Sequence, residues 1–188
     1  MDKRVLLAMM GGLAYATLGK AAALTGPTAY FPDAILHDQH DRPLRFYSDL
    51  LKDKIVIINM MYTVCSGICP ANTRRMRELQ EALGPRVGRD VFMYSMTLRP
   101  ETDTPAALAA YAEKYRTGPG WSFLTGRPAD IDLIRRKLGF YDSDPVADAD
   151  ITNHTGVIRI GNLRRDRWLM MPNASPAALV VKSVENIS

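Results

Sequence analysis

The two cysteines of this 188-residue chain lie four residues apart in "YTVCSGICP", as Cys65 and Cys69. If Cys65 lies in a loop and Cys69 opens a helix, both sulfur atoms can point to one spot, and the helix N-terminus then stabilises thiolates. Two adjacent thiolates can form a disulfide or bind a soft metal ion. Because redox pairs usually have the closer C-x-x-C spacing, the wider bite found here suits metal coordination at least as well.

The plainer alternatives are two inert buried cysteines or a stabilising disulfide. A disulfide that closes so short a loop removes little chain entropy from the unfolded state, so it would stabilise the fold poorly. We therefore favour a reactive or metal-binding pair.

The chain has three histidines that could complete a metal site. His37 and His40 lie in the polar stretch "HDQHDRP", where a weak surface site is possible but solvated turn residues are favoured. His154 follows a polar loop and precedes an apolar strand. Taken alone, it is typical of a loop histidine bonded to backbone. Beside a cysteine pair, it becomes the candidate third ligand.

Two thiolates and one imidazole form a soft site. Thiolates select Cu(I), zinc or iron–sulfur clusters, and imidazole accepts copper or zinc. Structural zinc sites usually have four protein ligands, and the sequence offers no evident fourth. Three soft ligands without a fourth favour Cu(I), although they do not exclude zinc.

The elements around the cysteines predict how the pair is positioned. The run Ile55–Tyr62 is continuously apolar and rich in β-branched residues, which indicates a strand buried on both faces. An amphipathic helix is expected over 71–83, stopped by Gly84, and a second buried strand over 91–98. Together they form a βαβ unit in which the cysteines follow the carboxyl end of the first strand, where reactive groups gather in open α/β sheets.

The remaining pattern completes a thioredoxin-like α/β fold, with a central mixed sheet flanked by helices and an N-terminal β-hairpin. The residues 141–153 are expected to form a polar loop. The other expected elements are a hairpin around 38–43, helices over 104–116, 128–139 and 175–188, a strand over 121–126, and a hairpin over 155–171 that turns near Gly161 and Asn162.

Composition and the N-terminus indicate one exported domain. The chain is 47% apolar and 23% charged, and its net charge of +4 includes no basic run with interleaved aromatics, so nucleic acid is not an expected partner. Residues 1–24 have the order of a secretory signal: basic, apolar, then small. We expect a cleaved signal or, second, an uncleaved anchor, with a buried helix as the plain alternative. The domain then spans 25–188 and faces an oxidising compartment.

Three segments of the chain resemble the Sco/SenC family of copper proteins. "CSGICP" matches the family's C-x-x-x-C-P signature, "RPETDTPAALAAYAEKY" resembles its D-P-E-x-D-T-P segment, and "ITNHTGVIRIGN" resembles its histidine segment. The resemblance implies a thioredoxin-like fold and a Cu(I)/Cu(II) site made of Cys65, Cys69 and His154. It also implies a copper chaperone that supplies cytochrome c oxidase and that can reduce cysteines in its target subunit.

The resemblance further implies a periplasmic or membrane-anchored protein, or one of the mitochondrial intermembrane space, attached to the membrane only through its N-terminal segment. Three departures from the family mark a divergent member: Arg99 replaces an acid, Asn153 replaces an aspartate, and Gly161-Asn162 replaces an Asp-Pro turn. A copper target other than the oxidase is therefore possible. The alternatives are a thiol–disulfide oxidoreductase or thiol peroxidase, with a thiol reductant as partner, and a copper or redox sensor, all using the same cysteines.

Overall fold

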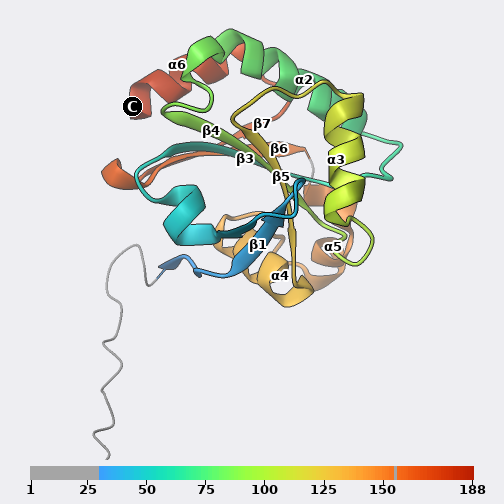
Figure 1. Cartoon of the computed structure of the whole chain (residues 1–188). Helices are drawn as coiled ribbons and strands as arrows, with labels where there is room; N and C mark the ends of the chain where they lie inside the picture. Colours follow the sequence, from blue (N-terminus) through green and yellow to red (C-terminus); the bar gives the residue numbers. More distant parts are fainter. Residues whose placement is uncertain (1–29, 155) are drawn as a thin grey trace, which may run out of the picture.

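The computed structural model describes residues 30–154 and 156–188. Its seven-stranded mixed sheet has the order β2-β1-β5-β4-β3-β6-β7 and carries helices on both faces (Figure 1). This confirms the predicted mixed sheet with its N-terminal hairpin, while the predicted leader 1–24 lies outside the described residues. The strands are β1 (Ile35–Asp38), β2 (Pro43–Arg45), β3 (Ile55–Met61), β4 (Val91–Thr97), β5 (Trp121–Gly126), β6 (Val157–Asn162) and β7 (Arg167–Pro172).

Strands β3, β4 and β5 form the parallel centre of the sheet. All seven residues of β3 are buried, as its unbroken apolar run predicts. The outer strands pair antiparallel, β1 with β5 and β6 with β3. The cysteine segment therefore leaves the sheet from the carboxyl end of a strand that has neighbours on both sides.

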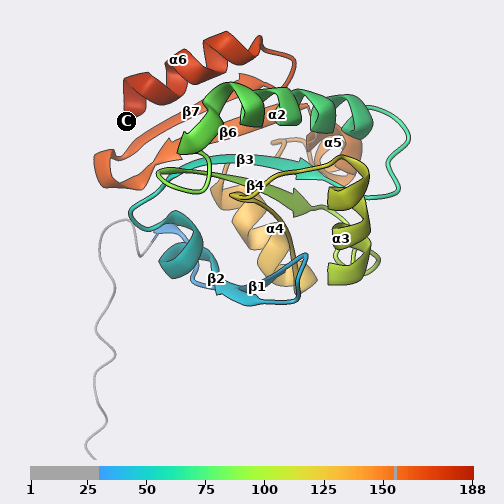
Figure 2. The same cartoon turned by 45° about the horizontal axis from the view of Figure 1, so that its top comes forward.

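The helices form two layers, one on each face of the sheet (Figure 2). Residues of α2, α3 and α6 pack on one face, and residues of α4 and η1 pack on the other. Among the described residues, no helix is both long enough and apolar enough to cross a membrane. The helices are η1 (Phe46–Leu51), α2 (Cys69–Leu83), η2 (Gly84–Arg86), α3 (Pro105–Lys114), α4 (Pro128–Lys137), α5 (Pro145–Ala149), η3 (Ile151–His154), η4 (Leu163–Arg165) and α6 (Ala177–Ile187).

Helix α2 begins at Cys69, two residues before the expected start, with Pro70 in its first turn. Proline suits this position because the first helical N–H groups have no partner within the helix. The helix ends at Gly84, whose φ of 53° is accessible to glycine at little cost. Cys69 thus opens the helix, the placement that would let both sulfur atoms point to one spot.

Two predicted loop or turn regions differ from the structure, and residues 46–51, which follow the first hairpin, form a helix that was not predicted. The predicted loop 141–153 contains α5 and most of η3. The second hairpin turns at η4 rather than at Gly161, which lies within β6 opposite Trp168. A Cβ atom on Gly161 would lie 2.1 Å from an atom of the Trp168 ring, so this glycine makes room for an indole and does not form the turn.

Candidate metal centre

The two cysteines lie together at the junction of β3 and α2. The backbone N–H of Cys65 donates to the carbonyl of Tyr62 at 3.3 Å, which folds the segment after β3 into a turn. Cys65 is partly exposed, Cys69 is 1% exposed, and both are free thiols. The structure thus brings the two sulfur atoms into hydrogen-bonding contact, as the spacing predicts.

The two thiols differ in acidity. Burial opposes ionisation of Cys65, but hydrogen bonds from the Cys69 thiol and amide and from Tyr62 outweigh it, so the pKa of Cys65 lies below its ordinary value. For Cys69, burial and the hydrogen bond with Cys65 raise the pKa to about 12. Cys65 is therefore the thiol that ionises first, and Cys69 the one that keeps its proton.

A buried carboxylate fixes the start of the cysteine loop. Asp103 is 0% exposed and accepts hydrogen bonds from the Thr63 N–H at 3.1 Å and the Thr63 hydroxyl at 2.5 Å. It also accepts from the Thr97 hydroxyl at the end of β4, at 2.6 Å. The role of this residue was not predicted from the sequence, although an acid between two threonines ahead of a proline-started helix was a usable signal. Asp103 thus links Thr63, at the start of the cysteine loop, to the end of β4.

Tyr62 and Arg99 lie beside Cys65. The hydrogen bond between the Tyr62 hydroxyl and Cys65, together with burial, raises the pKa of Tyr62 to about 12. The Arg99 guanidinium stands 5.5 Å from the centre of the Tyr62 ring, within the range of a cation–π contact. Arg99, which replaces an acid of the family pattern, therefore brings a positive charge close to the cysteine pair.

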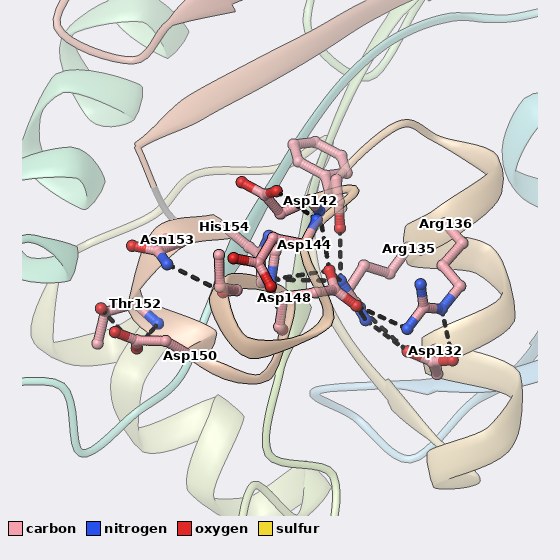
Figure 3. Close-up of polar contacts among 12 residues, drawn as sticks. Asp132, Arg135, Arg136, Asp142, Asp144, Asp148, Asp150, Thr152, Asn153 and His154 are labelled. Atoms are coloured by element: carbon pink, nitrogen blue, oxygen red, sulfur yellow. Dashed lines mark hydrogen bonds and ion pairs between the residues drawn. The ribbon is translucent and has the colours of Figure 1, made fainter.

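His154 lies at the end of η3, 4% exposed, in a cluster with Arg135 of α4 and Asp148 of α5 (Figure 3). Its Nε2 atom lies 3.0 Å from the Asp148 carbonyl oxygen and 3.3 Å from the Arg135 Nη1 atom. The Arg135 guanidinium donates to both carboxylate oxygens of Asp148, at 2.7 and 3.0 Å. A buried fork of this kind fixes the segment that carries His154.

The structure thus assembles the predicted cysteine pair, whereas the His154 Nε2 atom faces Asp148 and Arg135. In the part of the chain that the structure describes, no group of three or more His, Cys, Asp or Glu side chains is placed to hold a metal ion. His37 lies in β1 and bonds Asp41 of the β1–β2 turn at 2.7 Å, and His40 lies in that turn. The assignment of His154 as third ligand remains a prediction.

The chain matches known proteins over most of its length. The SCO1/SenC family model matches residues 35–187. A curated relative, an SCO2-like protein of Rickettsia conorii, is 30% identical over 109 residues, which cover 58% of this chain and 52% of the relative. The SCO1 protein homolog of Bacillus subtilis is 35% identical over 77 residues, 40% of this chain and 39% of the relative. The matches thus span about half of these relatives' length, or less.

Solved structures of similar fold agree with this match. A SCO1/SenC family lipoprotein from Bacillus anthracis superposes with a TM-score of 0.69 at 20% identity, covering 84% of this chain and 94% of that one. Bradyrhizobium japonicum ScoI with copper bound superposes with a TM-score of 0.63 at 23% identity, covering 82% and 96%. These likenesses confirm the predicted thioredoxin-like fold. Since the family model covers most of the chain, from β1 to α6, this protein belongs to the SCO1/SenC family.

Proposed function

We propose that this protein is an exported chaperone that holds copper through Cys65, Cys69 and His154 and delivers it to a respiratory oxidase or another copper protein. The observation that carries the proposal is the pair of free thiols, in contact with each other where β3 meets α2. Soft thiolates favour Cu(I) over harder ions. Among the structural relatives, the Bradyrhizobium ScoI and yeast Sco1 structures are described as having copper bound.

The two cysteines have different tasks in this proposal. Cys65, with its lowered pKa, would meet the ion first as a thiolate. Cys69 would lose its proton on binding, because the positive charge of the ion favours the thiolate. Copper binding should therefore release a proton near neutral pH, and the affinity should fall as the pH falls.

His154 would be the third ligand through its Nδ1 atom. A histidine that ligates a metal usually donates its other ring N–H to a carbonyl or carboxylate, which fixes the tautomer. The contact of Nε2 with the Asp148 carbonyl at 3.0 Å is suited to that role. It would place the proton on Nε2 and leave Nδ1 with a lone pair for copper.

The sequence and one relative support a proposal for the cellular setting. We propose that residues 1–24 direct export or anchor the chain, and that 25–188 form the copper-binding domain on the periplasmic or equivalent side. One structural relative, from Bacillus anthracis, is described as a lipoprotein. Another, BsSco, is described as a member of the Sco family of cytochrome c oxidase assembly proteins. An oxidase subunit is accordingly the first recipient to test.

The second candidate function is thiol–disulfide exchange with a protein partner, as a reductase or a redox sensor. The asymmetry of the pair favours it, because a half-exposed, more acidic Cys65 beside a buried, less acidic Cys69 suits an attacking and a resolving thiol. In this case His154 would be dispensable.

A competition titration tests the proposal. Reduced protein would receive one equivalent of Cu(I) without air and be titrated with a chromogenic Cu(I) chelator, beside His154→Ala and the matched control His37→Ala. We expect one tight site, weakened at least tenfold in His154→Ala and unchanged in His37→Ala. Weak binding in all three proteins would refute the chaperone and leave thiol–disulfide exchange as the function of the pair.

A further inference from the structure

Arg99 is an exposed cation held in a fixed place beside the cysteine pair. Its backbone N–H donates to the Thr97 hydroxyl at 2.8 Å, and its carbonyl accepts from the backbone N–H groups of Thr102 and Asp103. Its guanidinium lies 5.5 Å from the Tyr62 ring centre, and Tyr62 contacts Cys65. The positive charge is thus positioned from both its main chain and its side chain.

The charge of Arg99 is not neutralised by an ion pair within residues 30–154 and 156–188, where the arginine–carboxylate pairs engage other arginines. The carboxylate of Asp103 is buried and accepts from Thr63 and Thr97. Exposed Glu101 lines a 250 Å³ cavity together with His154. Arg99 therefore presents its charge to whatever approaches Cys65.

The surface around Cys65 has the composition of a small docking rim. Val64 is 64% exposed and Ile68 is 46% exposed, so two aliphatic side chains flank the half-exposed thiol. Exposed apolar groups beside one unpaired cation suit a partner with an apolar contact and a negative charge. Charge complementarity of this kind acts mainly on the rate of encounter.

We propose that Arg99 selects acidic partners for the cysteine pair: a protein whose copper-receiving or disulfide-bonded sulfur atoms are flanked by carboxylates. The inference deepens the proposed function, since it rests on Cys65 being the group that meets the partner. It assigns Arg99 a role in specificity, acting on the approaching molecule rather than on the sulfur chemistry itself.

Small disulfides of different charge serve as probes, because they react with the same thiols and supply the oxidant. The Cys65 thiolate attacks one sulfur of the probe, a protein–probe S–S bond replaces the probe S–S bond, and one probe thiolate leaves. Cys69 then loses its proton to solvent and attacks the Cys65 sulfur. This step forms the Cys65–Cys69 disulfide and releases the second probe thiolate, so one probe is reduced for each pair oxidised.

The test measures the rates at which the reduced protein reacts with dianionic 5,5′-dithiobis(2-nitrobenzoate), uncharged 2-hydroxyethyl disulfide and dicationic cystamine. Wild type is compared with Arg99→Gln, Arg99→Glu and the control Arg165→Gln, which removes an exposed arginine of η4, near the opposite end of β3. We expect the anionic-to-cationic rate ratio to fall several-fold in Arg99→Gln and about tenfold or more in Arg99→Glu at low ionic strength. This difference in rate ratio between wild type and the Arg99 variants should largely vanish in 0.5 M salt.

The outcomes separate the inference from its alternatives. An anionic-to-cationic ratio unchanged within twofold in Arg99→Glu would overturn it. An equal slowing of all three probes would also overturn it, because Arg99 would then act on the thiol and not on the partner. Chelator titration of the same proteins tests the chaperone function independently. If wild type binds no copper tightly, the chaperone function is refuted, whereas the preference of the cysteine pair for anionic partners is not affected.

Discussion

Replacing Asp103 with alanine should release the cysteine loop from the sheet. The side chain is 0% exposed and accepts three hydrogen bonds, two from Thr63 and one from Thr97. Hydrogen bonds to a charged group contribute about 1.5–3 kcal/mol each, and a buried donor left without a partner costs about 1–3 kcal/mol. A hydroxyl can rotate toward another acceptor, whereas the direction of the Thr63 backbone N–H is fixed. We therefore expect a loss of about 3–5 kcal/mol in the free energy of unfolding.

Urea unfolding of the reduced protein at pH 7 measures this loss. It should also appear as a fall in melting temperature of roughly 6–20 °C for a chain of this size. Asp90→Ala is the matched control, because Asp90 pairs with Arg86 at 2.8 Å but is 40% exposed, and such surface pairs contribute about 1 kcal/mol or less. A loss in Asp103→Ala no larger than that of the control would refute the view that this carboxylate anchors the loop.

Two further predictions concern acidity. Iodoacetamide at pH 7.5 should alkylate Cys65 at least tenfold faster than Cys69, because thiolates are the reacting species. Burial and the hydrogen bond with Cys65 raise the pKa of Cys69 to about 12, whereas the pKa of Cys65 is lowered. Peptide mapping over time measures both rates, and equal rates would contradict the difference in acidity between the two thiols. The hydrogen bond and charge of Arg135 hold the pKa of Asp148 well below its usual range, so the stability it contributes is present at neutral pH and lost as the pH falls below about 4. Asp148→Asn should therefore be about 3–5 kcal/mol less stable than wild type at pH 7, and this difference should narrow toward pH 2 in urea unfolding; a constant difference would show that the ionised carboxylate is not the cause.

Much of the fold was predictable because its signals are local. The unbroken apolar run of β3 and the prolines that start helices can each be recognised within a few residues of sequence. At α3, the Thr104 hydroxyl accepts from the Ala107 N–H, as its place before Pro105 predicts. The position of the cysteine pair was equally predictable, because the strand, the turn and the helix start that place it are contiguous in the sequence.

The missed features depend on contacts between distant residues. Gly161 lies in a strand because the Trp168 ring occupies the space beside it, and no local signal separates that use from a turn. Asp103 accepts a hydrogen bond from Thr63, which lies 40 positions away in the sequence. Arg135, the arginine beside His154, lies 19 positions before it on another element. In each case the tertiary partner decides the role, and residue type alone fits several roles.

The ligand set of bound copper is the central claim, and X-ray absorption at the copper edge of the Cu(I)-loaded protein tests it most directly. We predict a first shell of two sulfur atoms and one imidazole nitrogen, with the nitrogen absent in His154→Ala and the sulfur count unchanged. A shell of nitrogen and oxygen atoms alone, or one that is identical in wild type and His154→Ala, would contradict a site built from Cys65, Cys69 and His154.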